Sequence, residues 1–250
     1  MAGVRIRSWI SLIVIAGIFL FLIFNMSVWQ HMLGTIFPNE SEVVYPRAQL
    51  PQLLREHMIL VLASSAAAII TGTSIGILVT RERGRPWLGI VSDMSSLAQT
   101  IPPVAVLALA VPSIGFGFKP TVLALFLYSI LPIIRNTITG IESVPGRLIE
   151  AALGLGMKRS QVLFKVELPL SIKLIMAGIR TSVVINVGTA TVGAVVGAGG
   201  LGTPIISGLV RENPAFVLEG AITAALLALF LDQILARTEQ SLSRSLEKTT

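Results

Sequence analysis

Six long apolar stretches constrain the fold of this chain more than any other feature. A helix rises about 1.5 Å per residue, so roughly 20 apolar residues cross the hydrocarbon core of a bilayer. The sequence therefore predicts an all-α, polytopic membrane protein. The six expected spans are Trp9–Val28, His57–Thr80, Leu88–Ser113, Pro120–Gly140, Leu170–Val196 and Ala215–Ala236.

The composition supports lipid as the solvent and excludes several kinds of site. Charged residues make up 13% of the chain, against about a quarter in a soluble domain. Without cysteine there is no disulfide, thiolate metal site or cysteine nucleophile. His31 and His57 lie far apart in the sequence and form no metal-ligand pattern. We expect neither a metal nor a cofactor.

The Lys and Arg residues indicate the orientation. With the N-terminus inside, 14 of the 19 fall on the inner side and 4 on the outer side, while Arg180 lies within a span. Cytoplasmic loops carry an excess of such residues. We therefore expect both termini to be cytoplasmic. The same distribution explains the net charge of +6 without a nucleic-acid partner.

The first span has a second interpretation. Arg5 and Arg7 precede an apolar run, as in a signal peptide. No small-x-small cleavage site follows this run, so an uncleaved anchor is favoured.

Three segments divide the chain. Residues 1–56 are expected to form an anchor followed by an outer segment, which is irregular from residue 29 because it contains three prolines. Residues 57–236 form the transmembrane domain, with a long inner loop at 141–169. Residues 237–250 form an inner tail.

The inner loop has helical character. Pro145 suits a first helical turn, and Gly154 and Gly156 suit its end. The apolar residues follow a helical spacing of i, i+3, i+4 and i+7, namely Leu148, Ala151, Ala152 and Leu155. A second short helix is expected at about Arg159–Val166. Such a helix suits docking into a groove on a partner, or, alternatively, lying on the lipid surface.

This loop resembles that of ABC importer permeases, which carry Glu-Ala-Ala, three residues, Gly, nine residues, Ile, one residue and Leu-Pro. Here the motif reads Glu150-Ala151-Ala152, Gly156, Val166 and Leu168-Pro169, with Val in place of Ile. The resemblance implies a coupling helix that seats in a cleft of a cytoplasmic ATPase. The residues to which it assigns this role are Glu150, Ala151, Ala152, Gly154, Gly156, Leu168 and Pro169.

Further motifs resemble the osmoprotectant branch of that family, which carries glycine betaine, choline or carnitine. They are Gln99–Pro103, Leu131-Pro132, Arg135-Asn136, Ala177–Thr181 and Gly197–Gly202. The pair Pro102-Pro103 and the run Asn186–Thr191 look most like the Yeh-type betaine permeases. The resemblance implies a type I permease core of five helices, here the second to sixth spans. Residues 1–56 show no specific resemblance.

The resemblance also implies partners. These are cytoplasmic ABC ATPase subunits, a periplasmic or lipid-anchored substrate-binding protein and a second permease subunit, all at the bacterial inner membrane. The chain has no Gly-x4-Gly-Lys loop, so ATP is hydrolysed by another subunit, and the chain itself is not expected to be an enzyme. One alternative is an ABC permease for another small polar solute, such as an amino acid. Another is an ion-coupled transporter, although the acids within spans (Asp93, Glu219 and Asp232) all lie near span ends.

Polar groups near a helix break suggest the translocation path. Pro102 and Pro103 must break the third span, which lipid tolerates only where the backbone is buried or lines a cavity. The residues expected at the path or its gate are Gln99, Thr100, Pro102, Pro103, Tyr128, Asn186, Thr189, Gly199 and Gly200. The alternatives are hydrogen bonds between helices for the polar groups, packing for Tyr128 and a plain flexible loop for the glycines.

Arg180 lies deep in the fifth span and needs a partner or a wet cavity. We expect an ion pair with Asp93 first and with Asp232 second. The alternative is that Arg180 donates to backbone carbonyls freed by the proline break.

Overall fold

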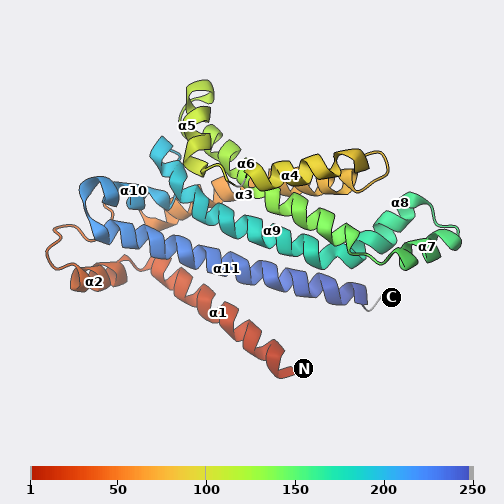
Figure 1. Ribbon diagram of the computed structural model, residues 1–250. Coiled ribbons are helices and arrows are strands. Elements are labelled where there is room, and N and C mark those ends of the chain that lie inside the picture. The colour runs from red at the N-terminus through yellow and green to blue at the C-terminus, as the bar shows by residue number, and fades with distance from the viewer. Residues whose placement is uncertain (1, 99, 248–250) are drawn as a thin grey trace. The chain divides into compact units, whose positions relative to one another are not determined.

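The computed structural model describes residues 2–98 and 100–247, with side chains described for residues 12–97 and 100–242. Every regular element in these ranges is a helix (Figure 1). The helices of ten or more residues are α1 (Ala2–Phe24), α2 (Met26–Ile36), α3 (Leu50–Val79), α4 (Leu88–Ala98), α5 (Pro103–Ile114), α6 (Phe118–Glu142), α9 (Leu168–Ala190), α10 (Gly202–Arg211) and α11 (Pro214–Glu247). The shorter ones are η1 (Arg85–Trp87), α7 (Gly146–Gly154), α8 (Arg159–Val162), the π-helical turn η2 (Leu163–Glu167) and η3 (Thr191–Val196).

Among the described residues, three helices have the length and apolar composition of a membrane span: α3, α6 and α11. A fourth span is reached if α1 and α2, which are bent by 87° at Asn25, count as one. The expected third span consists of two short helices, α4 and α5, because Pro102 and Pro103 lack the amide hydrogens that would continue α4. By length and composition alone, the number of spans is therefore smaller than the six expected.

Three segments outside the expected spans contain helices, including the outer segment that was expected to be irregular. The outer segment from residue 29 contains most of α2, and Pro51 lies in the first turn of α3, where proline is tolerated. The glycine-rich loop after the fifth span contains α10, and the expected inner tail continues α11 as far as Glu247. Trp29 explains the ordering of α2, since its side chain is fully buried and its indole Nε1–H donates to the carbonyl of Leu22 at 2.9 Å.

The chain forms two compact units, to which several helices contribute in part. The first unit comprises Met1–Ser64, Pro103–Leu125 and Val184–Ile234, and the second comprises Ser65–Pro102, Phe126–Val183 and Leu235–Thr250.

Small residues allow close helix packing in the second unit. A Cβ added to Gly76 of α3 would lie 2.6 Å from Cβ of Thr137 in α6, and one added to Gly178 of α9 would lie 2.5 Å from Cβ of Asn136. Ser182 of α9 donates to the carbonyl of Ser129 in α6 at 2.7 Å. Close approach through glycine and hydroxyl-to-backbone bonds is the usual way in which membrane helices associate.

Aromatic contacts hold the first unit together. The rings of Phe19 in α1 and Phe230 in α11 stack with their centroids 5.8 Å apart. Tyr45, in the connection before α3, meets Phe216 of α11 edge to face at the same separation. Such pairs stabilise a fold beyond the area that they bury.

Candidate functional site

The inner loop forms a short helical segment in the second unit, as its spacing predicts. The helix α7 follows Pro145 and ends at Gly154, and Gly156 has a φ of +81°, the left-handed conformation that favours glycine. The amide of Gly156 donates to the carbonyl of Leu153 and that of Met157 to the carbonyl of Ala152, which closes the helix end. We call residues 146–167, which contain α7, α8 and η2, the coupling segment.

The apolar face of α7 is only partly covered within the chain. Ala152 is buried, whereas Leu148 is 41% exposed and Leu155 is 85% exposed. Glu150 and Gly154 are exposed as well, while Leu168 and Pro169, at the start of α9, are half-buried. The segment thus presents leucine side chains together with a carboxylate, a combination that suits contact with another molecule.

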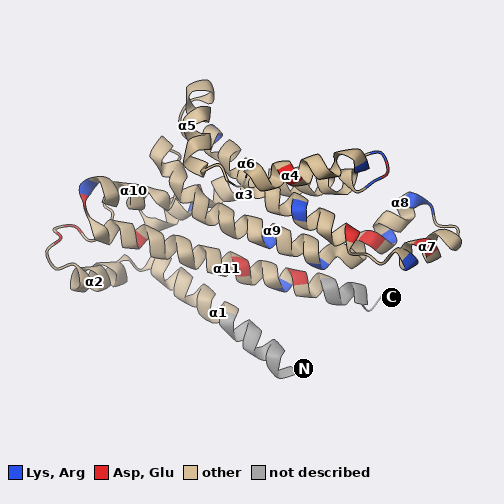
Figure 2. Ribbon diagram, viewed as in Figure 1, with Lys and Arg blue, Asp and Glu red and all other residues tan. Residues whose placement is uncertain are grey.

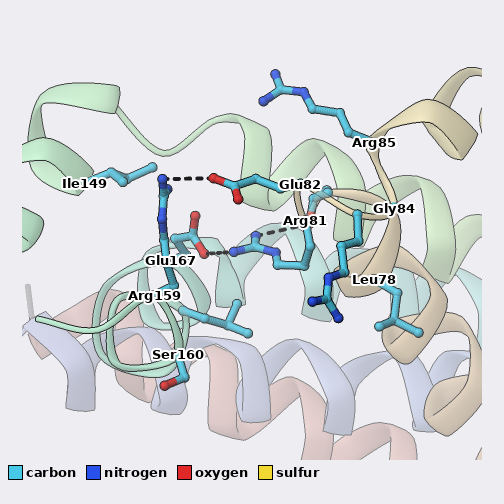
Figure 3. A pocket seen from close by; sticks show the side chains of 12 residues that line it. Leu78, Arg81, Glu82, Gly84, Arg85, Ile149, Arg159, Ser160 and Glu167 are labelled. Carbon is cyan, nitrogen blue, oxygen red and sulfur yellow. Dashed lines mark hydrogen bonds and ion pairs between the residues drawn. The ribbon is translucent and has the colours of Figure 1, made fainter.

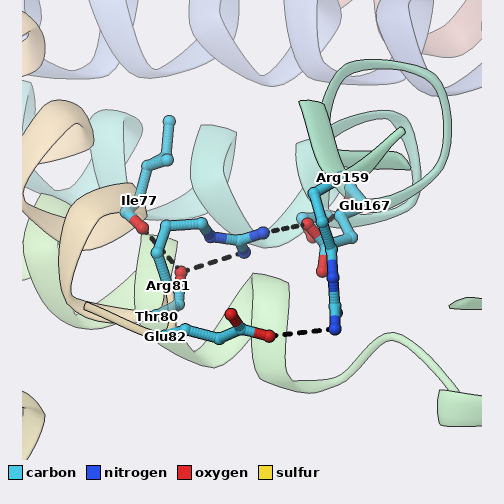
Figure 4. A network of polar contacts seen from close by, with 7 residues as sticks. Ile77, Thr80, Arg81, Glu82, Arg159 and Glu167 are labelled. Carbon is cyan, nitrogen blue, oxygen red and sulfur yellow. Dashed lines mark hydrogen bonds and ion pairs between the residues drawn. The ribbon is translucent and has the colours of Figure 1, made fainter. Parts of the chain in front are cut away.

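Two ion pairs join the coupling segment to the loop that follows α3 (Figure 4). Arg81 donates through Nη1 to Oε2 of Glu167 and through Nη2 to Oγ1 of Thr80, and Glu167 is buried. Arg159 lies 2.9 Å from Glu82, but both of these side chains are largely exposed. The pair that contains the buried carboxylate therefore contributes more to holding the segment than the exposed pair does.

A cavity of about 790 Å³ lies beside these ion pairs (Figure 3). It is lined by Leu78 and residues 80–85, by Ile149 of α7, and by Arg159, Ser160, Leu163 and Glu167. Figure 2 shows that charged residues are frequent in this part of the second unit, on the loop after α3 and on α7 and α8. The site contains ion pairs and not a nucleophile with a base. Its charged groups connect the coupling segment to the loop after α3.

The residues expected along the path fall into both units. Thr100, Pro102 and Tyr128 belong to the second unit, and Pro103, Asn186, Thr189, Gly199 and Gly200 belong to the first. Gln99 lies outside the described residues. The Thr100 hydroxyl donates to the carbonyl of Leu97 at 2.7 Å. Asn186 is fully buried, and its Nδ2 donates to Oγ of Ser64 in α3 at 3.1 Å, a hydrogen bond between helices of the kind given as the alternative.

The glycine-rich loop in the first unit rests on two polar residues of α3. Gly197, Gly199 and Gly200 all have φ between +76° and +79°. Glu56 accepts a hydrogen bond from the amide of Gly200 at 2.9 Å, and Nδ1 of His57 accepts one from the amide of Leu201 at 3.3 Å. Neither residue was expected at this site from the sequence. The sequence feature that could have indicated them is a Glu-His pair at the start of an apolar stretch, where polar side chains need hydrogen-bond partners.

Arg180 lies near an acid, Glu239, that was not among the partners expected from the sequence. Its Nη1 lies 4.0 Å from Oε2 of Glu239, on the helical extension of α11. Asp93, the first expected partner, is exposed. Pairing of Arg180 with Asp93 or Asp232 stays a prediction.

Comparison with known proteins gives a consistent result. Residues 72–244 match the family described as binding-protein-dependent transport system inner membrane component. The chain is 39% identical over 214 residues to the glycine betaine/carnitine/choline transport system permease protein OpuCB of Bacillus subtilis, and the alignment covers 86% of this chain and 94% of that protein. It is 38% identical over 219 residues to the osmoprotectant import permease protein OsmY of Salmonella typhimurium, with 88% of this chain and 90% of that protein covered.

A solved structure is similar in fold. The inward-facing MetNI methionine ABC transporter superposes with a TM-score of 0.66 at 21% identity, over 75% of this chain and 93% of the matched chain.

Proposed function

This chain belongs to the family of binding-protein-dependent transport system inner membrane components, and from that membership we propose that it is the membrane-spanning subunit of an ATP-driven importer of osmoprotectants. The solutes are quaternary ammonium compounds such as glycine betaine or choline. The names of the relatives support this substrate class, since OpuCB and OsmY are named for such solutes and align over most of this chain.

The coupling segment carries the proposal. Its exposed Leu148, Leu155 and Glu150 form a surface to which a cytoplasmic ATPase docks. The ion pair of Arg81 with buried Glu167 joins that surface to α3. Movement of the docked ATPase therefore reaches a transmembrane helix through a charge-assisted contact, a strong kind of polar contact.

Contacts between loops support the proposed membrane topology. Two loops in contact lie on the same side of the membrane, so an even number of spans must separate them. Arg81 contacts Glu167, and the α4–α5 pair and α6 lie between these two residues in the sequence. The amide of Gly117 donates to the carbonyl of Val196, and α6 and α9 lie between these two. If α6 crosses, then the α4–α5 pair crosses as one broken span, and so does α9.

A third contact also joins two loops that an even number of spans separates. Asn213 donates to the carbonyl of Glu42 at 2.8 Å, and Arg211 lies 3.7 Å from the Glu42 carboxylate. Four spans separate these loops when α3, the α4–α5 pair, α6 and α9 all cross. Together with α1 and α11 this gives six spans, with both termini cytoplasmic in the bacterial inner membrane.

Transport then proceeds by alternating access. A binding protein delivers the solute to the outer loops, closure of the ATPase dimer moves the coupling segments of two permease subunits, and the path opens outward and then inward. Recognition of a quaternary ammonium group normally uses aromatic faces, and the chain has few aromatic residues, 3 Trp, 2 Tyr and 10 Phe. Affinity therefore resides mainly in the binding protein.

The test is uptake by the reconstituted complex. The chain is purified with its ATPase and binding protein and placed in vesicles, and accumulation of labelled glycine betaine, choline, carnitine and methionine is measured with ATP and with a non-hydrolysable analogue. We expect uptake of at least one quaternary ammonium solute only with hydrolysable ATP. Uptake driven by an ion gradient would refute the importer, and ATP-dependent uptake of methionine alone would refute the substrate class.

A further inference from the structure

Glycine at positions 199 and 200 lets the glycine-rich loop lie close against α3. A Cβ on Gly199 would lie 2.4 Å from Oε2 of Glu56, and a Cβ on Gly200 would lie 3.0 Å from Nδ1 of His57. The first separation is shorter than real Cβ contacts and the second is tight, and both glycines have a positive φ (+79° and +78°) at which a side chain is strained. A substitution at either position would therefore disturb the contact of the loop with Glu56 and His57.

The neighbours of His57 fix which of its ring nitrogens carries the hydrogen. The carbonyl oxygen of Val187, 3.0 Å from Nε2, can only accept, and the amide of Leu201, 3.3 Å from Nδ1, can only donate. The ring is therefore neutral, with its hydrogen on Nε2. Since His57 is fully buried and both nitrogens are used, its ring bridges α9 to the loop with no spare polar atom.

The side chains of Glu56 and His57 accept from amides at the start of a helix. Val187 lies in the last turn of α9, which continues directly into η3. Gly200 and Leu201 directly precede α10, where amide hydrogens have no partner within the helix and a negative charge is favourable. The carboxylate of Glu56 occupies that position.

We propose that Glu56 and His57 are positioning residues that latch the loop Gly197–Gly202 to α3 at the outer end of the translocation path. The proposal deepens the function proposed above and rests on it. The latch holds the loop in the arrangement described here while no binding protein is docked. Docking with solute releases the two amides from their acceptors, so that the loop moves without unfolding α3 or α9.

Two matched substitutions separate the two hydrogen bonds of the ring. In His57→Asn the side-chain oxygen takes the place of Nδ1 and can still accept from Leu201, but the bond to Val187 is lost. In His57→Gln the amide nitrogen takes the place of Nε2 and can still donate to Val187, but the bond to the loop is lost. Both remove the ring, so the loss of packing is similar in the two variants.

The readout is the reactivity of one cysteine. The chain contains no cysteine, so Ala198→Cys places a unique thiol within the loop. The complete transporter in vesicles is treated with a water-soluble maleimide before any solute is added. We expect His57→Gln to be labelled roughly fivefold to tenfold faster than the parent, the shift that loss of about one buried hydrogen bond gives, whereas His57→Asn stays within about twofold.

Two variants of Glu56 provide an independent test if both His57 variants fail to insert into the membrane. Glu56→Ala should raise the labelling rate, and Glu56→Gln, which keeps an acceptor for Gly200, should do so less. Gln52→Ala is the control, since Gln52 bonds only the other oxygen of Glu56, at 3.1 Å. Equal labelling of the two His57 variants, or of all Glu56 variants, would overturn the latch. Failure of the parent complex to take up solute would instead overturn the proposed function, because labelling needs no solute.

Discussion

At the residue scale, the Arg81–Glu167 contact is the joint between α3 and the coupling segment. Glu167 is buried and accepts from Arg81, so Arg81→Met leaves a carboxylate buried without its charge partner. Removing one member of a buried pair costs about 3–5 kcal/mol, and the partial exposure of Arg81 places this case at the lower end. We expect the Tm of the purified subunit to fall by roughly 5 °C or more.

The control for this prediction is the neighbouring exposed pair. Glu82→Gln removes the partner of Arg159, but both side chains are largely in solvent, so the free energy of unfolding should change by about 0.5 kcal/mol or less. The double variant Arg81→Met, Glu167→Leu should be more stable than Arg81→Met alone, because no unpaired charge remains. A drop in Tm of equal size in Glu82→Gln would contradict the distinction between the two pairs.

Arg180 is a second residue whose partner can be identified by experiment. Arg180→Gln is combined in turn with Glu239→Gln, Asp232→Asn and Asp93→Asn, and Tm is measured for each single and double variant. Residues in contact show coupling of about 0.5 kcal/mol or more, whereas distant ones add. The 4.0 Å separation leads us to expect coupling with Glu239, and additivity with all three acids would contradict an ion pair.

At the scale of the element, the turn after α7 sets the direction of the coupling segment. Gly156 has a φ of +81°, and no atom lies within 4 Å of a Cβ built on it, so a side chain there meets backbone strain and no clash. Gly156→Ala should therefore insert normally but lower both ATP-driven uptake and co-purification of the ATPase by about tenfold, since strain of roughly 1–2 kcal/mol opposes the turn.

Two variants serve as controls for this element. Gly154→Ala also has open space at its Cβ but a helical backbone, so it should behave as the parent does. Gly156→Asn should recover much of the activity that Gly156→Ala loses, because asparagine tolerates the left-handed conformation. If Gly154→Ala and Gly156→Ala weaken docking equally, then general flexibility, not the turn, is what the glycines supply.

At the scale of the whole molecule, the paired loops and the distribution of charge make the same prediction about topology. A reporter enzyme inserted after Glu40 should read outside, because that segment contacts the loop at Arg211–Asn213. A reporter after Ser143 should read inside, next to the coupling segment. An inside signal at Glu40 would show that α1 and α2 form a re-entrant hairpin, and it would reduce the number of spans by one.

Much of this architecture followed from the sequence alone, since it depends on local chemistry. Apolar runs of sufficient length located α3, α6 and α11, and two consecutive prolines separated α4 from α5 because proline lacks an amide hydrogen. The turn at Gly156 followed from its place at the end of an amphipathic stretch. The spacing of Glu150, Gly156 and Leu168-Pro169 was enough to indicate the family, because the motif lies within one short, continuous stretch of the sequence.

The tertiary structure alone decided which distant groups meet. Nothing in the spacing of Glu56 and His57 shows that they receive the amides of Gly200 and Leu201, more than 140 positions away. Likewise, Glu239 reaches Arg180 only because α11 continues as a helix beyond its apolar stretch. The periodicity of apolar residues shows which face of a helix is buried. Which residues of different helices meet depends on how the helices pack, and many weak contacts together determine that packing.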